Sequence, residues 1–138
     1  MQLDPAAFHA GSELIAALKQ RAATVGCPAD RILFLQGEVP NGIYILEKGE
    51  VVLSMSTPTG KTVTDARARS GSLLGLPGLV SNEPYTMTAV AQPGAELSFL
   101  DRQSFAHIMH TCPTLAIQIL QVLAAEVRSA RLALVADC

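Results

Sequence analysis

The spacing of apolar and polar residues changes twice along the chain of 138 residues. Residues 5–23 carry apolar side chains at helical spacing, with Ser12 placed to cap the helix. Between residues 31 and 101 the apolar residues occur in short runs separated by glycine-containing turns, which is typical of a β-sandwich or β-barrel. Helical spacing returns after Asp101. The pattern predicts a single domain in three parts: an N-terminal helical part at 1–24, a β-barrel at 25–101 and C-terminal helices at 102–138.

The central part predicts a series of strands, two of which form a hairpin. The expected strands are residues 32–35, 43–46, 51–56, 61–69, 85–91 and 96–100. The turn Thr57-Pro58-Thr59-Gly60 between the third and fourth of these is a hairpin signal. In the fourth strand, alternation separates two faces: Val63, Asp65, Arg67 and Arg69 on one, and Thr62, Thr64, Ala66 and Ala68 on the other. We expect the face with the arginines to be solvated.

The C-terminal part predicts a short helix at 102–110 and a long helix from Pro113 to about Ala136. Apolar residues of the long helix recur at steps of four, three, four, three and four: Ala116, Leu120, Leu123, Val127, Ala130 and Leu134. This repeat averages about 3.5 residues, the period of a coiled-coil seam, and its alanines would let two helices approach closely. We expect a parallel homodimer through this seam. The alternative is that the stripe only docks the helix on its own barrel.

The composition indicates a folded, apolar protein with few charges. Hydrophobic residues make up 49% of the chain and charged residues 16%, which excludes intrinsic disorder and suggests that another chain covers some apolar surface. The formal net charge is −2, and Lys and Arg form no block, so the chain lacks the basic patch of a nucleic-acid-binding protein. Aromatic residues are 4% and Trp is absent, which disfavours a base-stacking surface.

Cysteine use and hydropathy predict a cytoplasmic protein without membrane contact. The three cysteines are odd in number and form no CxxC motif. We expect Cys27 and Cys112 to be small buried residues and Cys138 to be exposed. The sequence has no run of about 18 uncharged apolar residues, and its N-terminus lacks the features of a signal peptide.

The segment 32–46, followed by Gly49-Glu50-Val51 and the turn at Gly60, resembles the signature of the cyclic nucleotide-binding domain. The likeness is greatest to the sensor domain of the catabolite-activator/fumarate-nitrate regulators of bacteria, and it extends over nearly the whole chain. It implies a β-barrel of the double-stranded jelly-roll type, with N-terminal helices and a long C-terminal dimerisation helix. It also implies a non-enzymatic sensor that signals through that helix and the dimer interface. The glycines of the signature are turn residues, so they identify the fold and not the ligand.

The ligand signal of this family is a phosphate-binding cassette, which the resemblance places on residues 74–89. The family's Glu, which binds the ribose hydroxyl, falls on Leu76, and its Arg, which binds the cyclic phosphate, falls on Tyr85. Pro77 also lacks a backbone N–H that could point at an anion. Loss of a buried charged hydrogen bond costs about 2–5 kcal/mol, so we expect binding of cAMP and cGMP to be weak or lost. The expected ligand-binding residues are Leu74, Gly75, Leu76, Pro77, Pro84, Tyr85, Thr86 and Thr88.

Two arginines are candidate substitute cations for the pocket. Arg67 would reach it from the neighbouring strand and Arg131 from the long helix. The alternative for Arg67 is the solvated face of the barrel, and for Arg131 it is the surface or a contact between helices. If either enters the pocket, the chain remains a cyclic-nucleotide-binding regulator that uses substitute residues. Otherwise the pocket holds a different, unknown small ligand or none.

Other functions have weaker support in the residues. His107 and His110 lie three apart on one helix, so a metal could contact both, but a third ligand for an enzyme of the cupin type is missing. A haem-based gas sensor would use His9, His107 or Met109 as axial ligands. A purely structural dimerisation module is a further alternative. We expect no enzyme activity and no resident cofactor or metal. We also expect no direct DNA contact, because the helix-turn-helix of the related regulators would begin where this chain ends.

Overall fold

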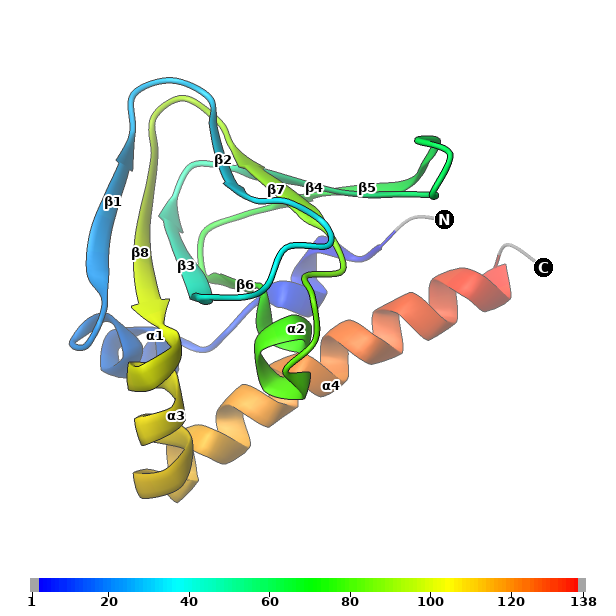
Figure 1. The fold of residues 1–138 in the computed structure, drawn as a ribbon. Coiled ribbons are helices and arrows are strands. Elements are labelled where there is room, and N and C mark those ends of the chain that lie inside the picture. Colours follow the sequence, from blue (N-terminus) through cyan, green and yellow to red (C-terminus); the bar gives the residue numbers. More distant parts are fainter. Residues whose placement is uncertain (1–2, 137–138) are drawn as a thin grey trace.

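The computed structural model describes residues 3–136, in which helices flank two antiparallel sheets (Figure 1). The strands are β1 (Ala23–Cys27), β2 (Arg31–Phe34), β3 (Gly42–Lys48), β4 (Val51–Ser56), β5 (Thr62–Ala68), β6 (Ser72–Leu74), β7 (Thr88–Ala91) and β8 (Ala95–Asp101). The helical segments are the 3₁₀ turn η1 (Pro5–Phe8), α1 (Ser12–Lys19), α2 (Leu76–Ser81), α3 (Arg102–Thr111) and α4 (Pro113–Ala136).

The two sheets have four strands each, in the orders β1-β8-β3-β6 and β2-β7-β4-β5. Within residues 3–136 no ladder joins an edge of one sheet to the other, so the strands form an open sandwich and the expectation of a closed β-barrel is wrong. Consecutive strands lie in different sheets except β4 and β5, and two of these sheet changes occur at glycines: Gly49 between β3 and β4, and Gly71 between β5 and β6. Both glycines have positive φ angles, +87° and +91°, which turn consecutive strands into different sheets instead of pairing them.

Strands that carry continuous aliphatic runs or clear alternation agree with the sequence pattern. The hairpin of β4 and β5 is confirmed, and β5 buries Thr64, Ala66 and Ala68 while Asp65 and Arg67 are exposed. β1 and β6 were not expected, because β1 consists mostly of small residues and β6 has only three residues; they pair with β8 and β3. The strand expected from residue 85 begins only at residue 88.

The N-terminal part is divided, so the expectation of one helix over residues 5–23 is wrong. η1 ends at Phe8, and His9 forms an isolated β-bridge with Ser72 before α1 begins. The N-cap of α1 is Gly11 rather than Ser12, and no side chain caps this helix. The bridge holds η1 beside the sheet, and the buried Phe8 packs in the core between the sheets.

Two apolar cores stabilise the fold, one on each face of β3. The first lies between the sheets and includes Phe34, Leu53 and Leu97. The second lies between β3, β8 and the helices, where Ile43 and Ile45 of β3 join residues of α1, α3 and α4. Because both faces of β3 are covered, its central run is apolar without alternation.

α4 crosses the molecule below the sandwich and packs against η1, α1 and α3 (Figure 1). α3 and α4 agree with the two helices expected from the sequence, at 102–110 and from Pro113 to about Ala136. Three residues of the expected seam, Leu120, Val127 and Leu134, are 45%, 42% and 58% exposed. The seam residues Leu123 and Ala130 instead pack against the protein's own cores. Across residues 3–136, no single helix is long and apolar enough to cross a membrane.

Candidate functional site

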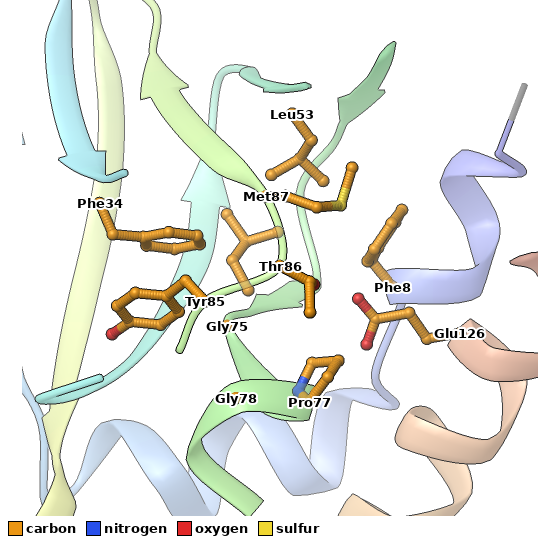
Figure 2. Close-up of a pocket in the computed structure, with 11 residues that line it drawn as sticks. Phe8, Phe34, Leu53, Gly75, Pro77, Gly78, Tyr85, Thr86, Met87 and Glu126 are labelled. Atoms are coloured by element: carbon orange, nitrogen blue, oxygen red, sulfur yellow. The ribbon is translucent and has the colours of Figure 1, made fainter. Parts of the chain in front are cut away.

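A small cavity lies where the sandwich, α2 and α4 meet (Figure 2). The space that the centre of a water molecule can occupy inside it is about 10 Å³, which is room for about one water. The lining residues are Phe8, Phe34, Leu53, Leu74, Gly75, Pro77, Gly78, Tyr85, Thr86, Met87 and Glu126. The structure thus brings together five of the expected ligand-binding residues: Leu74, Gly75, Pro77, Tyr85 and Thr86.

The other three expected residues lie outside this lining. Leu76 is fully buried and belongs to the second core, on the far side of β3 from the sandwich interior. Pro84 is exposed. Oγ1 of Thr88 accepts a 3.0 Å hydrogen bond from the backbone N–H of Gln36, so Thr88 holds the loop that follows β2.

Tyr85 is a fixed part of the cavity wall. Its ring stacks on Phe34, with the ring centroids 4.0 Å apart and 17° between the ring planes. Its hydroxyl donates a 2.7 Å hydrogen bond to the carbonyl oxygen of Gly42. Its backbone N–H donates to the carbonyl of Glu38, and its carbonyl accepts from the N–H of Gly37. Burial raises the pKa of the phenol, so Tyr85 is a neutral hydrogen-bond donor at physiological pH.

The start of α2 is poorly suited to bind an anion. Gly75 is the N-cap with a φ angle of +95°, and a Cβ on it would lie 2.9 Å from Cε1 of Tyr85. Pro77 in the first turn has no N–H to donate. The helix has only six residues, so few peptide dipoles are aligned. Free N–H groups and an aligned dipole, which together favour anions at helix starts, are therefore both reduced here.

Glu126 of α4 places a carboxyl group in the cavity, and Figure 2 shows it between Phe8, Pro77 and Thr86. Its Oε2 atom is buried and has no hydrogen-bond partner among the described residues. Desolvation raises the pKa of this carboxyl group to about 8.

The sequence analysis does not identify Glu126, although a signal for it exists. The side chains that α4 turns toward the rest of the molecule follow a helical stripe: Ile119, Val122, Glu126, Ala130 and Ala133. A lone acid on such a stripe is a candidate for burial. The expected seam lies beside this stripe on the helix and shares only Ala130 with it.

Neither candidate cation lies in the cavity lining. Arg67 is exposed on β5 and forms an ion pair with Glu50. Arg131 is exposed and borders a surface groove of α4 together with Leu120 and Val127. The alternative positions, a solvated strand face and the helix surface, are the ones observed.

Arg102, which the sequence analysis does not consider, holds the segments beside the cavity. Its Nη2 donates a 2.6 Å hydrogen bond to the carbonyl of Pro40, and its Nη1 donates a 2.8 Å bond to Oδ1 of Asn82. Asn82 is the C-cap of α2 and has a left-handed conformation. Arg102 therefore ties the end of α2 to the segment at Pro40.

The histidines and cysteines do not add to the site. Among the described residues, no three His, Cys, Asp or Glu side chains lie close enough to hold a metal ion. His9, His107 and His110 are exposed, and Met109 is half-buried. Cys27 is buried, as predicted, Cys112 is half-buried rather than buried, and Cys138 lies outside the described residues.

Comparison with known proteins decides the family. The family model of the cyclic nucleotide-binding domain matches residues 24–112, which include both sheets and the cassette region. The chain belongs to this family. The resemblance inferred from the glycine signature is thereby confirmed, and the protein is a regulatory domain of the cyclic nucleotide-binding type.

The relatives include regulators from two bacteria. The cyclic AMP receptor protein of Thermus thermophilus is 28% identical over 107 residues, which are 78% of this chain and 50% of that protein. The crystal structure of the catabolite activator protein of Thermus thermophilus matches with a TM-score of 0.78 and 26% identity, over 95% of this chain and 62% of that one. The N-terminal domain of a transcriptional regulator from Streptomyces coelicolor A3(2) shares the fold, with a TM-score of 0.67 and 23% identity over 94% of this chain and 90% of that one. The chain thus spans about half the length of the Thermus receptor.

Proposed function

We propose that this domain is a non-enzymatic sensor of a small ligand, in which binding of cAMP and cGMP is weak or lost. The observation that carries the proposal is Tyr85: it lies where the family resemblance expects the phosphate-binding Arg, and it is stacked on Phe34. The described lining residues include no Lys, Arg or His. A cyclic phosphate would lose a charge-assisted hydrogen bond without a replacement, at a cost of about 2–5 kcal/mol.

Two further features of the cavity oppose a cyclic nucleotide. Glu126 contributes an acidic group to the lining, and its ionised form would repel a phosphate. The cavity volume of about 10 Å³ is room for about one water, so the wall would have to move for any organic ligand, and furthest for a nucleotide. The acidic group supports a ligand of different chemistry.

We propose that α4 transmits the ligand signal. Glu126 of this helix lines the cavity. The helix is also attached to the N-terminal segment by a 2.9 Å hydrogen bond from the backbone N–H of Asp4 to Oγ of Ser129. A ligand larger than one water requires the wall to move, and in this proposal α4 is the part that moves relative to the sandwich. Ligand binding would then favour the state with α4 displaced.

The exposed stripe of α4 supports a homodimer as part of the same proposal. Leu120, Val127 and Leu134 present large apolar side chains at heptad spacing on the outside of the helix. Because the cavity and this stripe lie on one helix, a displacement of α4 would reach the dimer interface directly.

Calorimetric titration of the purified protein with cAMP and with cGMP tests the proposal. We expect dissociation constants weaker than about 10 μM for both nucleotides, with the Thermus receptor as the positive control. The Glu126→Gln variant removes the repulsion but supplies no cation, so we expect at most a small gain and dissociation constants that stay above about 10 μM. A wild-type dissociation constant below about 10 μM would overturn the proposal and identify a regulator that binds cyclic nucleotides through substitute residues.

A further inference from the structure

Glu126 has an unsatisfied carboxyl oxygen in the cavity between the sandwich, α2 and α4. Its Oε2 atom is buried without a hydrogen-bond partner among the described residues. A buried polar atom that lacks a partner costs free energy, and a carboxylate costs more than a neutral group. Such a group in a native fold calls for an explanation, such as a role in binding.

Most of the remaining lining is apolar, and Thr86 is the other polar side chain near the carboxyl group (Figure 2). Phe8, Leu53 and Met87 contribute apolar walls, and Phe34 lies on the side away from Glu126, stacked on Tyr85. The hydroxyl of Tyr85 is already engaged by the carbonyl of Gly42. The complementary ligand therefore has one strongly donating end and a compact apolar body.

We propose that the cavity, widened by displacement of α4, binds a small organic amine, with its ammonium group on the Glu126 carboxylate and its apolar body against Phe8 and Met87. This inference rests on the proposed sensor function, because it names the ligand class of the same site. An ammonium group supplies the positive charge that the cavity lacks, and it donates directly to the unpartnered oxygen. A neutral alcohol supplies the donor only, and an anion supplies neither.

No arginine supplies this charge, because the described lining residues include no Lys, Arg or His. Arg67 is paired with Glu50, and Arg102 donates to Pro40 and Asn82. In the free protein the pKa of Glu126 is raised to about 8, so this carboxyl group is protonated in most molecules at pH 7. Binding of an ammonium group stabilises the ionised form, so binding should release a proton.

The experiment compares benzylamine with benzyl alcohol and benzoate, three probes with the same ring and different head groups. Each is titrated by calorimetry at pH 7 into the wild-type protein, into Glu126→Gln and into Glu83→Gln. Glu83→Gln is the matched control, because Glu83 is an exposed acid just after α2. We expect benzylamine to bind the wild type at least about tenfold more tightly than benzyl alcohol, benzoate not to bind, and only Glu126→Gln to lose the preference.

Proton release gives a second readout that needs no variant. Titrations of the wild type with benzylamine in two buffers of different ionisation enthalpy should show release of up to about one proton. The inference is overturned if benzylamine binds no better than benzyl alcohol, if the preference persists in Glu126→Gln, or if binding releases no proton. Any of these results leaves the proposed function intact, since that proposal fails only if cAMP or cGMP binds tightly.

Discussion

Tyr85 and Glu126 line the same cavity, one from the loop before β7 and the other from α4 (Figure 2). The family resemblance expects a cation at the first of these positions. In this domain that position carries a neutral phenol, and the second contributes an acid. The cavity thus lacks the positive charge that a phosphate requires, and any charge that Glu126 acquires is of the opposite sign.

The pH dependence of stability provides a residue-scale prediction for Glu126. Its pKa is about 8 in the folded protein against an ordinary value of 4.5, so between these values the folded state holds a proton that the unfolded state has lost. The stabilisation from this group is complete below the unfolded value and disappears as the pH rises to about 8. We expect the wild type to lose up to about 1.4 kcal/mol of unfolding free energy per pH unit relative to Glu126→Gln.

Urea denaturation of both proteins between about pH 5 and pH 8 measures this difference. Groups common to the two proteins cancel in it, so the slope reports on residue 126 alone. Glu83→Gln serves as the exposed control for the loss of one carboxyl group. A flat difference for Glu126→Gln would mean that the Glu126 carboxyl group is not desolvated in the folded protein.

At the scale of the single element, α4 carries two adjacent apolar stripes with different surroundings. The stripe that contains Ile119 and Val122 packs on the protein's own cores, whereas Leu120 and Val127, one step around the helix, are exposed. The two alternatives drawn from the sequence, docking and dimerisation, thus involve different faces of one helix. Heptad spacing alone could not separate them, because both stripes follow nearly the same period.

Val127→Glu tests the outer stripe. Val127 is 42% exposed, so a Glu there leaves the folded domain intact but places a charge in the centre of the proposed dimer seam. We expect light scattering to give twice 14.5 kDa for the wild type and a single chain for the variant. Leu123 is a poorer choice for this test, because it also packs against the second core. The control is Gln121→Glu, which adds the same charge at an exposed polar position. An unchanged mass for Val127→Glu would exclude this face as the dimer interface.

How well each element was predicted follows from the chemistry of its residues. Runs such as Ile43–Leu46 and the alternation in β5 are strong local signals, and both strands are confirmed. β1 was missed because its residues Ala23–Cys27 are mostly small, and only pairing with β8 makes them a strand. The cavity was predicted in part: the cassette residues are contiguous in sequence, whereas Glu126 reaches them only through the docking of α4.

At the scale of the whole molecule, α4 and the N-terminal segment pack against each other. The hydrogen bond from Asp4 N–H to Oγ of Ser129 links residues 125 positions apart. No local pattern predicts such a contact, and the same is true of the sheet-changing turns that make the strands a sandwich rather than a barrel. The arrangement of the elements therefore depends on long-range contacts and on turns that local patterns do not predict.

Ser129→Ala should weaken the attachment of α4 to the N-terminal segment. Removal of an exposed hydrogen bond costs about 0.5–1.5 kcal/mol, so we expect little change in global stability. Amide hydrogen exchange should become faster in η1 and in the C-terminal half of α4, while β3 and β8 stay protected. Ser81→Ala is the matched control, because its hydroxyl donates to Pro77 within α2. Equal exchange in wild type and Ser129→Ala would show that this bond does not hold α4 in place.

The hydrogen bond from Tyr85 to Gly42 constrains how the sequence of this domain can change over generations. Its acceptor is a main-chain carbonyl, which no substitution at position 42 removes, and Gly42 itself is fixed because a Cβ there would lie 2.2 Å from the carbonyl oxygen of Leu100. A single exchange of Tyr85 for Arg would leave that carbonyl without its donor and Phe34 without its stacking partner. The intermediate would be less stable before any benefit from a new cation appeared. A change to Arg at position 85 therefore carries a cost in stability that substitutions elsewhere in the domain would have to offset.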